Sequence, residues 1–70
     1  SQSGWPNNLS DREMEVLEYV IRGLTNRETG EKLFISQHTA ATHVQHILRK
    51  TGMANRTELI MYALRSGMIE

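Results

Sequence analysis

The sequence has no cysteine, a single proline and few aromatic residues, and it contains no long apolar run. Without cysteine, disulfide bridges and thiolate metal sites are excluded, and a reducing compartment is compatible. No stretch approaches the roughly 20 apolar residues of a membrane span, and no signal-peptide pattern opens the chain, so we expect a cytoplasmic protein. Its 70 residues suffice for one small domain, which buries only about 60% of its unfolded surface and is marginally stable.

The formal net charge is zero, but the charges are unevenly distributed along the chain. Residues 1–31 carry a net charge of −3, residues 32–57 carry +4 with no acidic residue, and residues 58–70 carry −1. The middle block also contains His38, His43 and His46, which can add partial positive charge near a polyanion. Overall neutrality argues weakly against nucleic-acid binding. The placement of the charges argues for it and is more informative, because binding is local.

Capping residues divide the chain into four helical segments. A Ser or Thr followed three residues later by Glu forms a capping box at Ser10 and at Thr25, and Asn55 begins a similar segment. Ser36 is a strong N-cap residue, and glycines follow the expected helix ends. The sequence predicts an all-α fold, a four-helix bundle without strands. Its helices begin after Ser10, Thr25, Ser36 and Asn55 and end near Gly23, Leu33 or Phe34, Gly52 and Gly67.

The second and third expected helices are joined by a tight turn, which is typical of a helix-turn-helix motif. Gly30 stands in the middle of the second helix, where glycine costs about 1 kcal/mol relative to alanine. This position indicates that another helix comes close to the glycine backbone. A loosely constrained surface position is the alternative interpretation.

The third expected helix has two chemically distinct faces. Its apolar stripe contains Ala40, Val44, Ile47 and Leu48, which recur at helical spacing. The opposite face carries hydrogen-bonding groups and no carboxylate, whereas a face that serves only solubility normally shows both charge signs. We therefore expect the outer face to lie against a polar, negatively charged partner. It contains His38, Thr42, Gln45 and Arg49, flanked by Ala41 and His46.

The fourth expected helix is apolar most of the way round. Leu59, Tyr62 and Ala63 share the side expected to face the core, and further apolar residues spread over the rest. A terminal helix of this kind in so small a domain is expected to bury its second side against another chain, which predicts a homodimer. The candidate dimer contacts are Ile60, Met61 and Leu64.

Four separated motifs follow one pattern from Leu9 to about Ile69: L-S-x-R-E-x-E-V-L, G-L-T-N-R-E, L-F-I-S-x-x-T and H-V-x-x-I-L-R-K-x-G-M-x-N-R-T-E. The pattern resembles the DNA-binding domain of LuxR/FixJ/GerE-type bacterial transcription regulators. The resemblance implies that the third helix enters the major groove of DNA and the fourth mediates dimerisation. It also implies an output domain C-terminal to a receiver or ligand-sensing domain. We expect residues 1–8 to be a linker or a cloning remnant and residues 9–70 to form the helix-turn-helix domain.

The sequence departs from the family pattern at three places. Thr39-Ala40-Ala41 stands where the family usually has T-V-K, so the lysine often used for base contact is missing at Ala41. Gln45 occupies another reader position that is frequently basic. Thr29-Gly30 replaces the usual Ile-Ala pair, which keeps the small residue but puts a hydroxyl where an aliphatic side chain is expected.

Several side chains are candidates for contact with DNA bases. Gln45 has a donor and an acceptor that suit adenine, and His38 can donate to a guanine acceptor. Ala41 and the Thr42 methyl group suit thymine methyl groups, and Arg49 shares their face. The alternative interpretation is that these side chains are spacers and that specificity comes from DNA shape.

Candidate contacts with DNA phosphates come from helix ends and from the basic block. Helix N-termini offer unpaired N–H groups and partial positive charge, so the starts at Thr25 and Ser36 suit phosphate oxygens. Basic side chains add Coulomb attraction and counterion release. The resemblance implies roles for Asn26, Arg27, Thr39, His43 and Lys50. The full candidate set is Thr25, Asn26, Arg27, Ser36, Gln37, Thr39, His43, Lys50 and Arg56.

Other classes of function receive less support from the residues. The three histidines have no Asp, Glu or Cys close by in sequence to complete a metal site, so we predict no metal or other cofactor. The chain has no glycine-rich phosphate loop, no nucleophile elbow and no evident catalytic carboxylate pair, so we predict no enzymatic activity. The main rival to DNA binding is a protein-interaction module on a helix-turn-helix scaffold. RNA polymerase is a candidate further partner.

Overall fold

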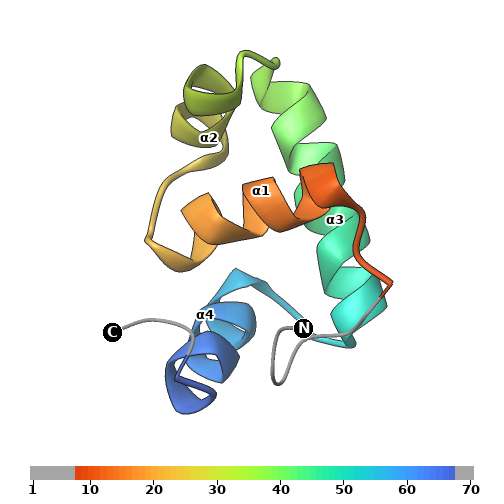
Figure 1. Ribbon diagram of the computed structural model, residues 1–70, viewed down its shortest axis with the longest axis vertical. Helices are drawn as coiled ribbons and strands as arrows, with labels where there is room; N and C mark the ends of the chain where they lie inside the picture. Colours follow the sequence, from red (N-terminus) through yellow and green to blue (C-terminus); the bar gives the residue numbers. More distant parts are fainter. Residues whose placement is uncertain (1–7, 68–70) are drawn as a thin grey trace.

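The computed structural model describes residues 8–67, which form four helices and no strand. These are α1 (Asp11–Ile21), α2 (Asn26–Leu33), α3 (Gln37–Thr51) and α4 (Arg56–Arg65) (Figure 1). The predicted all-α class and all four predicted helices are confirmed. Residues 1–7, which make up most of the expected linker, and residues 68–70 lie outside the described part of the chain.

The helices begin at the capping residues that the sequence indicates. At Ser10 the Oγ atom accepts a hydrogen bond from the Glu13 N–H (3.1 Å), and the Ser10 N–H donates to Glu13 Oε1 (2.9 Å). Thr25 and Glu28 repeat this box at the start of α2. The segment at Asn55 is different, because its Glu58 carboxylate accepts from the Ala54 N–H instead of the cap residue. A full capping box therefore starts α1 and α2 but not α4.

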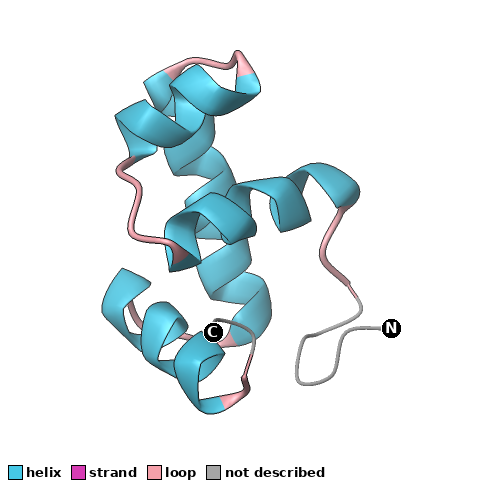
Figure 2. Ribbon diagram, turned by 60° about the vertical axis from the view of Figure 1, so that its left-hand side comes forward, coloured by secondary structure: helices cyan, strands magenta, loops and turns pink. Residues whose placement is uncertain are grey.

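The arrangement of the helices leaves one side of α3 uncovered. α3 is the longest helix and runs along the height of the domain, with α2 beside its N-terminal half (Figure 1). α1 crosses the middle of α3, and α4 packs against α1 near the other end of the domain (Figure 2). The second helix and the third thus form a helix-turn-helix pair that α1 braces from one side.

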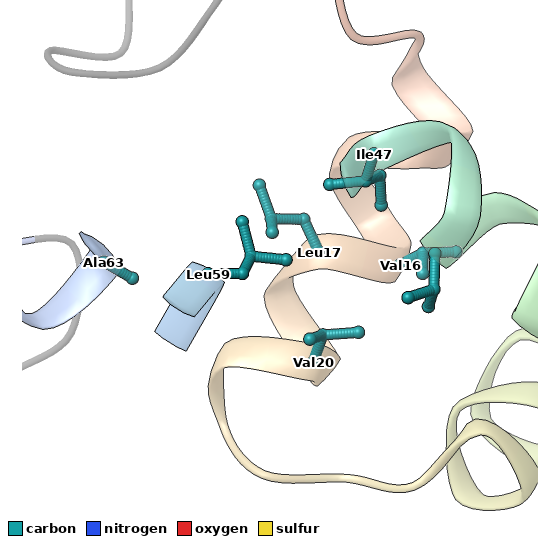
Figure 3. Close-up of a cluster of buried hydrophobic side chains, with 7 residues drawn as sticks. Val16, Leu17, Val20, Ile47, Leu59 and Ala63 are labelled. Carbon is teal, nitrogen blue, oxygen red and sulfur yellow. The ribbon is translucent and has the colours of Figure 1, made fainter. Parts of the chain in front are cut away.

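The hydrophobic core forms where α1 meets α3 and α4. Val16, Leu17 and Val20 of α1 form one buried cluster with Ile47 of α3 and Leu59 of α4, and Leu59 extends toward Leu17 (Figure 3). All of these side chains are at most 1% exposed. Full burial of one such side chain contributes about 1.5–3 kcal/mol to stability. The apolar stripe of α3 therefore faces the core, and this fixes the orientation of the helix.

The turn between α2 and α3 explains Gly30, but not in the way the sequence suggests. We expected a neighbouring helix at this position. Instead, a Cβ atom built on Gly30 would lie 2.7 Å from the Ile35 carbonyl oxygen and 3.2 Å from that of Ser36. The close approach therefore comes from the backbone of the turn itself. Phe34 makes this turn by adopting a left-handed conformation (φ 59°), with its side chain 95% exposed.

The Thr29 side chain is fully buried, and its Oγ1 atom has no hydrogen-bond partner. A buried polar group without a partner costs about 1–3 kcal/mol. We expect Thr29→Val, which replaces this hydroxyl by a methyl group, to raise the free energy of unfolding by about 1 kcal/mol. Thermal or urea unfolding measures the change, and the melting temperature should rise by about 4–8 °C.

Thr51→Val is the matched control for this substitution. The Thr51 Oγ1 atom donates to the Ile47 carbonyl oxygen at 2.8 Å, so its removal breaks a hydrogen bond and should bring no gain. Equal stability changes for the two valine variants would show that the Thr29 hydroxyl carries no penalty.

Candidate nucleic-acid interface

The side of α3 that faces away from the core is open to solvent. His38, Thr42, Gln45 and Arg49 are exposed and Ala41 is half-buried, whereas the stripe residues Ala40, Val44 and Ile47 are buried. The Thr42 hydroxyl donates to the His38 carbonyl oxygen at 3.1 Å. The predicted division of α3 into an inner and an outer face is confirmed. The roles of the outer residues in base reading stay predictions.

The N-terminal ends of α2 and α3 present polar groups at the surface. Thr25, Ser36 and Gln37 are exposed, and the Ser36 Oγ atom caps α3 by accepting from the Thr39 N–H (3.0 Å). Arg27 is exposed beside Glu31, with 3.6 Å between Nε and Oε2. Because both of these side chains are mostly exposed, their ion pair contributes little and leaves the guanidinium available to a stronger anion.

One flank of α3 carries a row of half-buried polar residues between the exposed face and the core. Thr39, His43, His46 and Lys50 follow each other at helical spacing and are each half-buried. The first two are candidate phosphate contacts at the N-terminal half of the row. His46 and Lys50 lie next to α1, where both of them approach a buried carboxylate.

That carboxylate is Glu13 of α1, which is only 4% exposed. The Lys50 Nζ atom donates to Glu13 Oε1 at 2.8 Å and to the Asn8 carbonyl oxygen at 3.1 Å. The His46 Nδ1 atom lies 3.7 Å from Glu13 Oε2. Burial acts to raise the pKa of Glu13, but the hydrogen bonds from Lys50 and Ser10 and the lysine charge together lower that pKa. Glu13 therefore joins α1, α3 and the segment that leads into α1.

Arg56, another candidate phosphate contact, is also engaged within the domain. Its Nη1 atom donates to Asn26 Oδ1 and its Nη2 atom donates to the Leu24 carbonyl oxygen, both at 2.6 Å. These bonds connect the first residue of α4 to the first residue of α2. The sequence does not show this brace, because the two residues lie 30 positions apart.

The positive potential of the basic block is therefore smaller than its sequence charge suggests. Lys50 is neutralised by Glu13. Arg56 keeps its charge, because its partners are neutral, but its guanidinium already donates to Asn26 and to the Leu24 carbonyl oxygen. Within the described residues, Lys32 and Arg49 are the basic side chains of residues 32–57 that are exposed and not engaged by another side chain. A ligand that approaches the outer face of α3 thus meets mainly hydrogen-bonding groups and the Arg49 charge.

The outward side of α4 carries exposed apolar side chains. Met61 is 48% exposed and Leu64 is 53% exposed, and Ile60 is half-buried. A shallow groove beside Met61 is lined by Met53, Thr57, Glu58 and Arg65. The predicted apolar outer surface of the fourth helix is present, whereas its use in dimerisation stays a prediction.

The described residues contain no group of three or more His, Cys, Asp or Glu residues that could hold a metal ion. No carboxylate lies near the histidines in sequence, but the fold brings Glu13 of α1 close to His46. One histidine and one carboxylate that already bonds Lys50 do not make a metal site. Between residues 8 and 67, no helix has the length and apolar character needed to cross a bilayer.

Comparison with known proteins identifies the family to which this chain is similar. The model of the family described as "Bacterial regulatory proteins, luxR family" matches residues 7–63. The transcriptional regulatory protein YxjL of Bacillus subtilis is 42% identical over 62 residues, which cover 89% of this chain and 28% of the relative. The oxygen regulatory protein NreC of Staphylococcus aureus shows the same identity over 89% of this chain and 29% of its own length.

The chain spans less than a third of the length of these curated relatives. The matched family is one of DNA-binding regulators and not a class of enzymes. Its match covers α1, α2 and α3 entirely and most of α4. The chain belongs to the luxR family of bacterial regulatory proteins and is a helix-turn-helix DNA-binding domain of that family.

Proposed function

We propose that the domain binds double-stranded DNA sequence-specifically, as the output domain of a longer transcription regulator in the cytoplasm. In this proposal α3 enters the major groove, and the role of the domain is binding and not catalysis. The observation that carries the proposal is the exposed outer face of α3, which has no carboxylate and presents His38, Thr42, Gln45 and Arg49. Major-groove edges of bases offer the donors and acceptors that such side chains complement.

Phosphate contacts in this proposal come from both sides of the reading face. The exposed starts of α2 and α3 supply N–H groups and helix-dipole charge to the DNA backbone. Arg27 adds a cation at the first of these ends. Lys50 contributes through the N–H that remains beside its bonds to Glu13 and Asn8. Arg56 acts mainly by holding Asn26 and the start of α2 in place.

Gln45→Ala tests the base-reading assignment directly. Gln45 is exposed at the centre of the outer face, and its amide can make a bidentate contact with adenine. We expect the substitution to relax the preference at one base position by about 1–3 kcal/mol while the rest of the selected motif is kept. Selection of binding sites from a random pool of duplexes, with both proteins at the same salt concentration, measures this change. Identical motifs for the two proteins would remove Gln45 from the base contacts.

We further propose that two copies associate through α4 on a site with two half-sites. One domain offers a small interface with DNA, and linkage of two copies raises affinity through effective concentration. The exposed side chains of Met61 and Leu64, with Ile60 beside them, support this role for α4. RNA polymerase remains a proposed further partner of a regulator assembled in this way.

Leu64→Glu tests the proposed dimer. The Leu64 side chain is 53% exposed, so a charged residue is tolerated in the monomer but costs desolvation at an apolar interface. We expect the variant to shift from dimer toward monomer in sedimentation equilibrium, with an unchanged melting temperature in dilute solution. Arg22→Gln, at the exposed end of α1, changes the net charge by the same −1 outside α4 and is the control. Unchanged association of Leu64→Glu would place the dimer contact elsewhere.

A protein-interaction module is the second candidate function. Two observations favour it. Ala41 stands at a usual lysine position, and the basic residues Lys50 and Arg56 are engaged within the domain. Salt distinguishes the two functions. DNA binding should weaken steeply with salt even on random duplexes, whereas a protein-binding surface has no need to bind duplexes.

A further inference from the structure

Phe34 combines two features that each cost the isolated domain free energy. Its side chain is 95% exposed, whereas Leu64, the next most exposed large apolar residue in the described part of the chain, is 53% exposed. Its φ of 59° lies in the left-handed region, where a bulky residue is an outlier. A single exposed apolar side chain needs no explanation, but backbone strain of this kind is typical of functional positions. The other described residues with positive φ are all glycines: Gly23, Gly52 and Gly67.

The turn between α2 and α3 imposes this conformation on Phe34. The N–H groups of Phe34 and Ile35 both donate to the Gly30 carbonyl oxygen, the second of them at 3.0 Å. Glycine or asparagine adopts the left-handed conformation more easily than phenylalanine does. Phenylalanine at this position therefore lowers the stability of the domain, and its exposed ring gains almost no contact within the domain in return.

The turn adjoins the end of α3 that enters the major groove in the proposed function. Phe34 precedes the cap residue Ser36 by two positions, so their Cα atoms are at most about 7.6 Å apart. The groove is about 12 Å wide, so a strand that borders it passes within reach of the turn when Gln37 and His38 face the bases. Lys32, two positions before Phe34, is exposed and not engaged by another side chain within the described residues. A partner that covers the ring thus also meets a free cation and the positive end of α3, which suits a DNA backbone.

We propose that the Phe34 ring packs against a deoxyribose of bound duplex DNA, at the edge of the major groove beside the start of α3. The inference rests on the proposed function and adds to it a contact of a different chemistry. Deoxyribose is the apolar part of the DNA backbone and is the same for all four bases. The ring therefore adds affinity that depends neither on base sequence nor on salt.

Phe34→Asn removes the ring and keeps a residue that tolerates the left-handed conformation. We expect its melting temperature to rise by about 4 °C, because the strain is relieved. Its affinity for duplexes of any sequence should fall about fivefold. The selected DNA motif and the salt slope should stay unchanged, whereas Gln45→Ala should change the motif and Arg27→Gln the salt slope. Phe34→Tyr keeps the ring and should bind within about twofold of the original protein.

The contact can also be observed without substitution, because Phe34 is the only phenylalanine of the chain. With ¹³C-labelled phenylalanine and a bound duplex of selected sequence, isotope-filtered NOE spectra show which DNA protons lie close to this one ring. We expect NOEs to deoxyribose protons.

Three results would each overturn the inference. They are NOEs to thymine methyl groups in place of deoxyribose protons, equal losses of affinity for Phe34→Tyr and Phe34→Asn, and an unchanged affinity of Phe34→Asn for duplexes. The last result would leave a protein as the partner of the ring. Absence of binding to any duplex by the unsubstituted domain would overturn the proposed function itself, and the inference with it.

Discussion

Lys50→Ala is expected to lower the free energy of unfolding by about 3 kcal/mol, because it leaves the Glu13 carboxylate buried without its ion-pair partner. The Glu13 side chain is 6% exposed and that of Lys50 is 31% exposed, so the pair is far better shielded from water than a surface pair. For a domain of this size, a loss of 3 kcal/mol is a large part of the total stability. Urea unfolding at pH 7 measures it.

The exposed pair of Arg12 and Glu15 provides the matched control. Their side chains are 44% and 56% exposed, and Arg12 Nη1 lies 3.2 Å from Glu15 Oε1. Arg12→Ala should therefore cost less than about 0.5 kcal/mol. The double variant Glu13→Gln, Lys50→Met should recover part of the stability that Lys50→Ala loses, since no buried charge remains. A cost for Lys50→Ala no larger than that of Arg12→Ala would contradict the assigned role of the pair.

The pH dependence of stability should also change in the Lys50→Ala variant. In the folded protein the pKa of Glu13 is lowered, so its contribution to stability is present above the ordinary pKa of glutamate and is lost as the pH falls through the folded pKa. Without Lys50, its hydrogen bond and its charge no longer lower the pKa of Glu13, so the folded pKa moves upward. The midpoint of acid unfolding should therefore move to higher pH in Lys50→Ala, which circular dichroism can follow.

The engagement of Lys50 also changes what its substitution does to DNA binding. A free lysine on a phosphate would reduce the salt slope by about one unit when removed. Because Lys50 is already paired with Glu13, the expected reduction is smaller than one unit, while affinity falls for all sequences alike. The comparison must be made at a temperature at which the variant is fully folded. A reduction by a full unit would show that Lys50 leaves Glu13 when DNA binds.

Gly30→Ala is expected to destabilise the domain by about 3 kcal/mol, although alanine is the better helix former by about 1 kcal/mol. The added Cβ would lie 2.7 Å from the Ile35 carbonyl oxygen, and neither backbone can move away easily. The Ile35 N–H donates to the Gly30 carbonyl oxygen at 3.0 Å and holds the turn against α2. Urea unfolding measures this loss, and weaker DNA binding should accompany it because the turn sets the start of α3.

Gly52→Ala is the control that separates steric overlap from backbone strain. Gly52 ends α3 with φ 74°, and a Cβ atom there meets nothing within 4 Å. Its substitution should cost only the strain of a left-handed alanine, about 1–2 kcal/mol. A stabilised Gly30→Ala variant would mean that the α2–α3 turn is looser than the structure shows.

The sequence predicted the helices and the two faces of α3 because local rules decide them. Caps such as Ser10 and Ser36 fix where a helix begins, and the 3.6-residue period fixes which residues share a face. Gly52 in the left-handed conformation ends α3 as expected. These features depend on neighbours within a few positions, so they can be read before any tertiary contact is known.

The contacts that the sequence did not reveal are those between distant residues. Lys50 and Arg56 counted as free cations, and their partners Glu13 and Asn26 lie 37 and 30 positions away. One signal was present: Glu13 occupies the apolar side of α1, where a carboxylate needs a partner. No such signal marked the conformation of Phe34. Phenylalanine ordinarily avoids positive φ and exposure of its ring, so its local preferences predicted neither.

The exposed side of α3 is the feature on which the proposed function depends, and its contact with duplex DNA can be observed directly. The measurement is an NMR titration of the ¹⁵N-labelled domain with a random-sequence duplex in dilute buffer. The chemical shifts of the backbone amides report which residues contact the DNA. We expect the largest changes along α3 from Gln37 to Arg49 and at the start of α2, and we expect them to disappear as salt is added. Unchanged spectra, or changes confined to α4, would contradict the account.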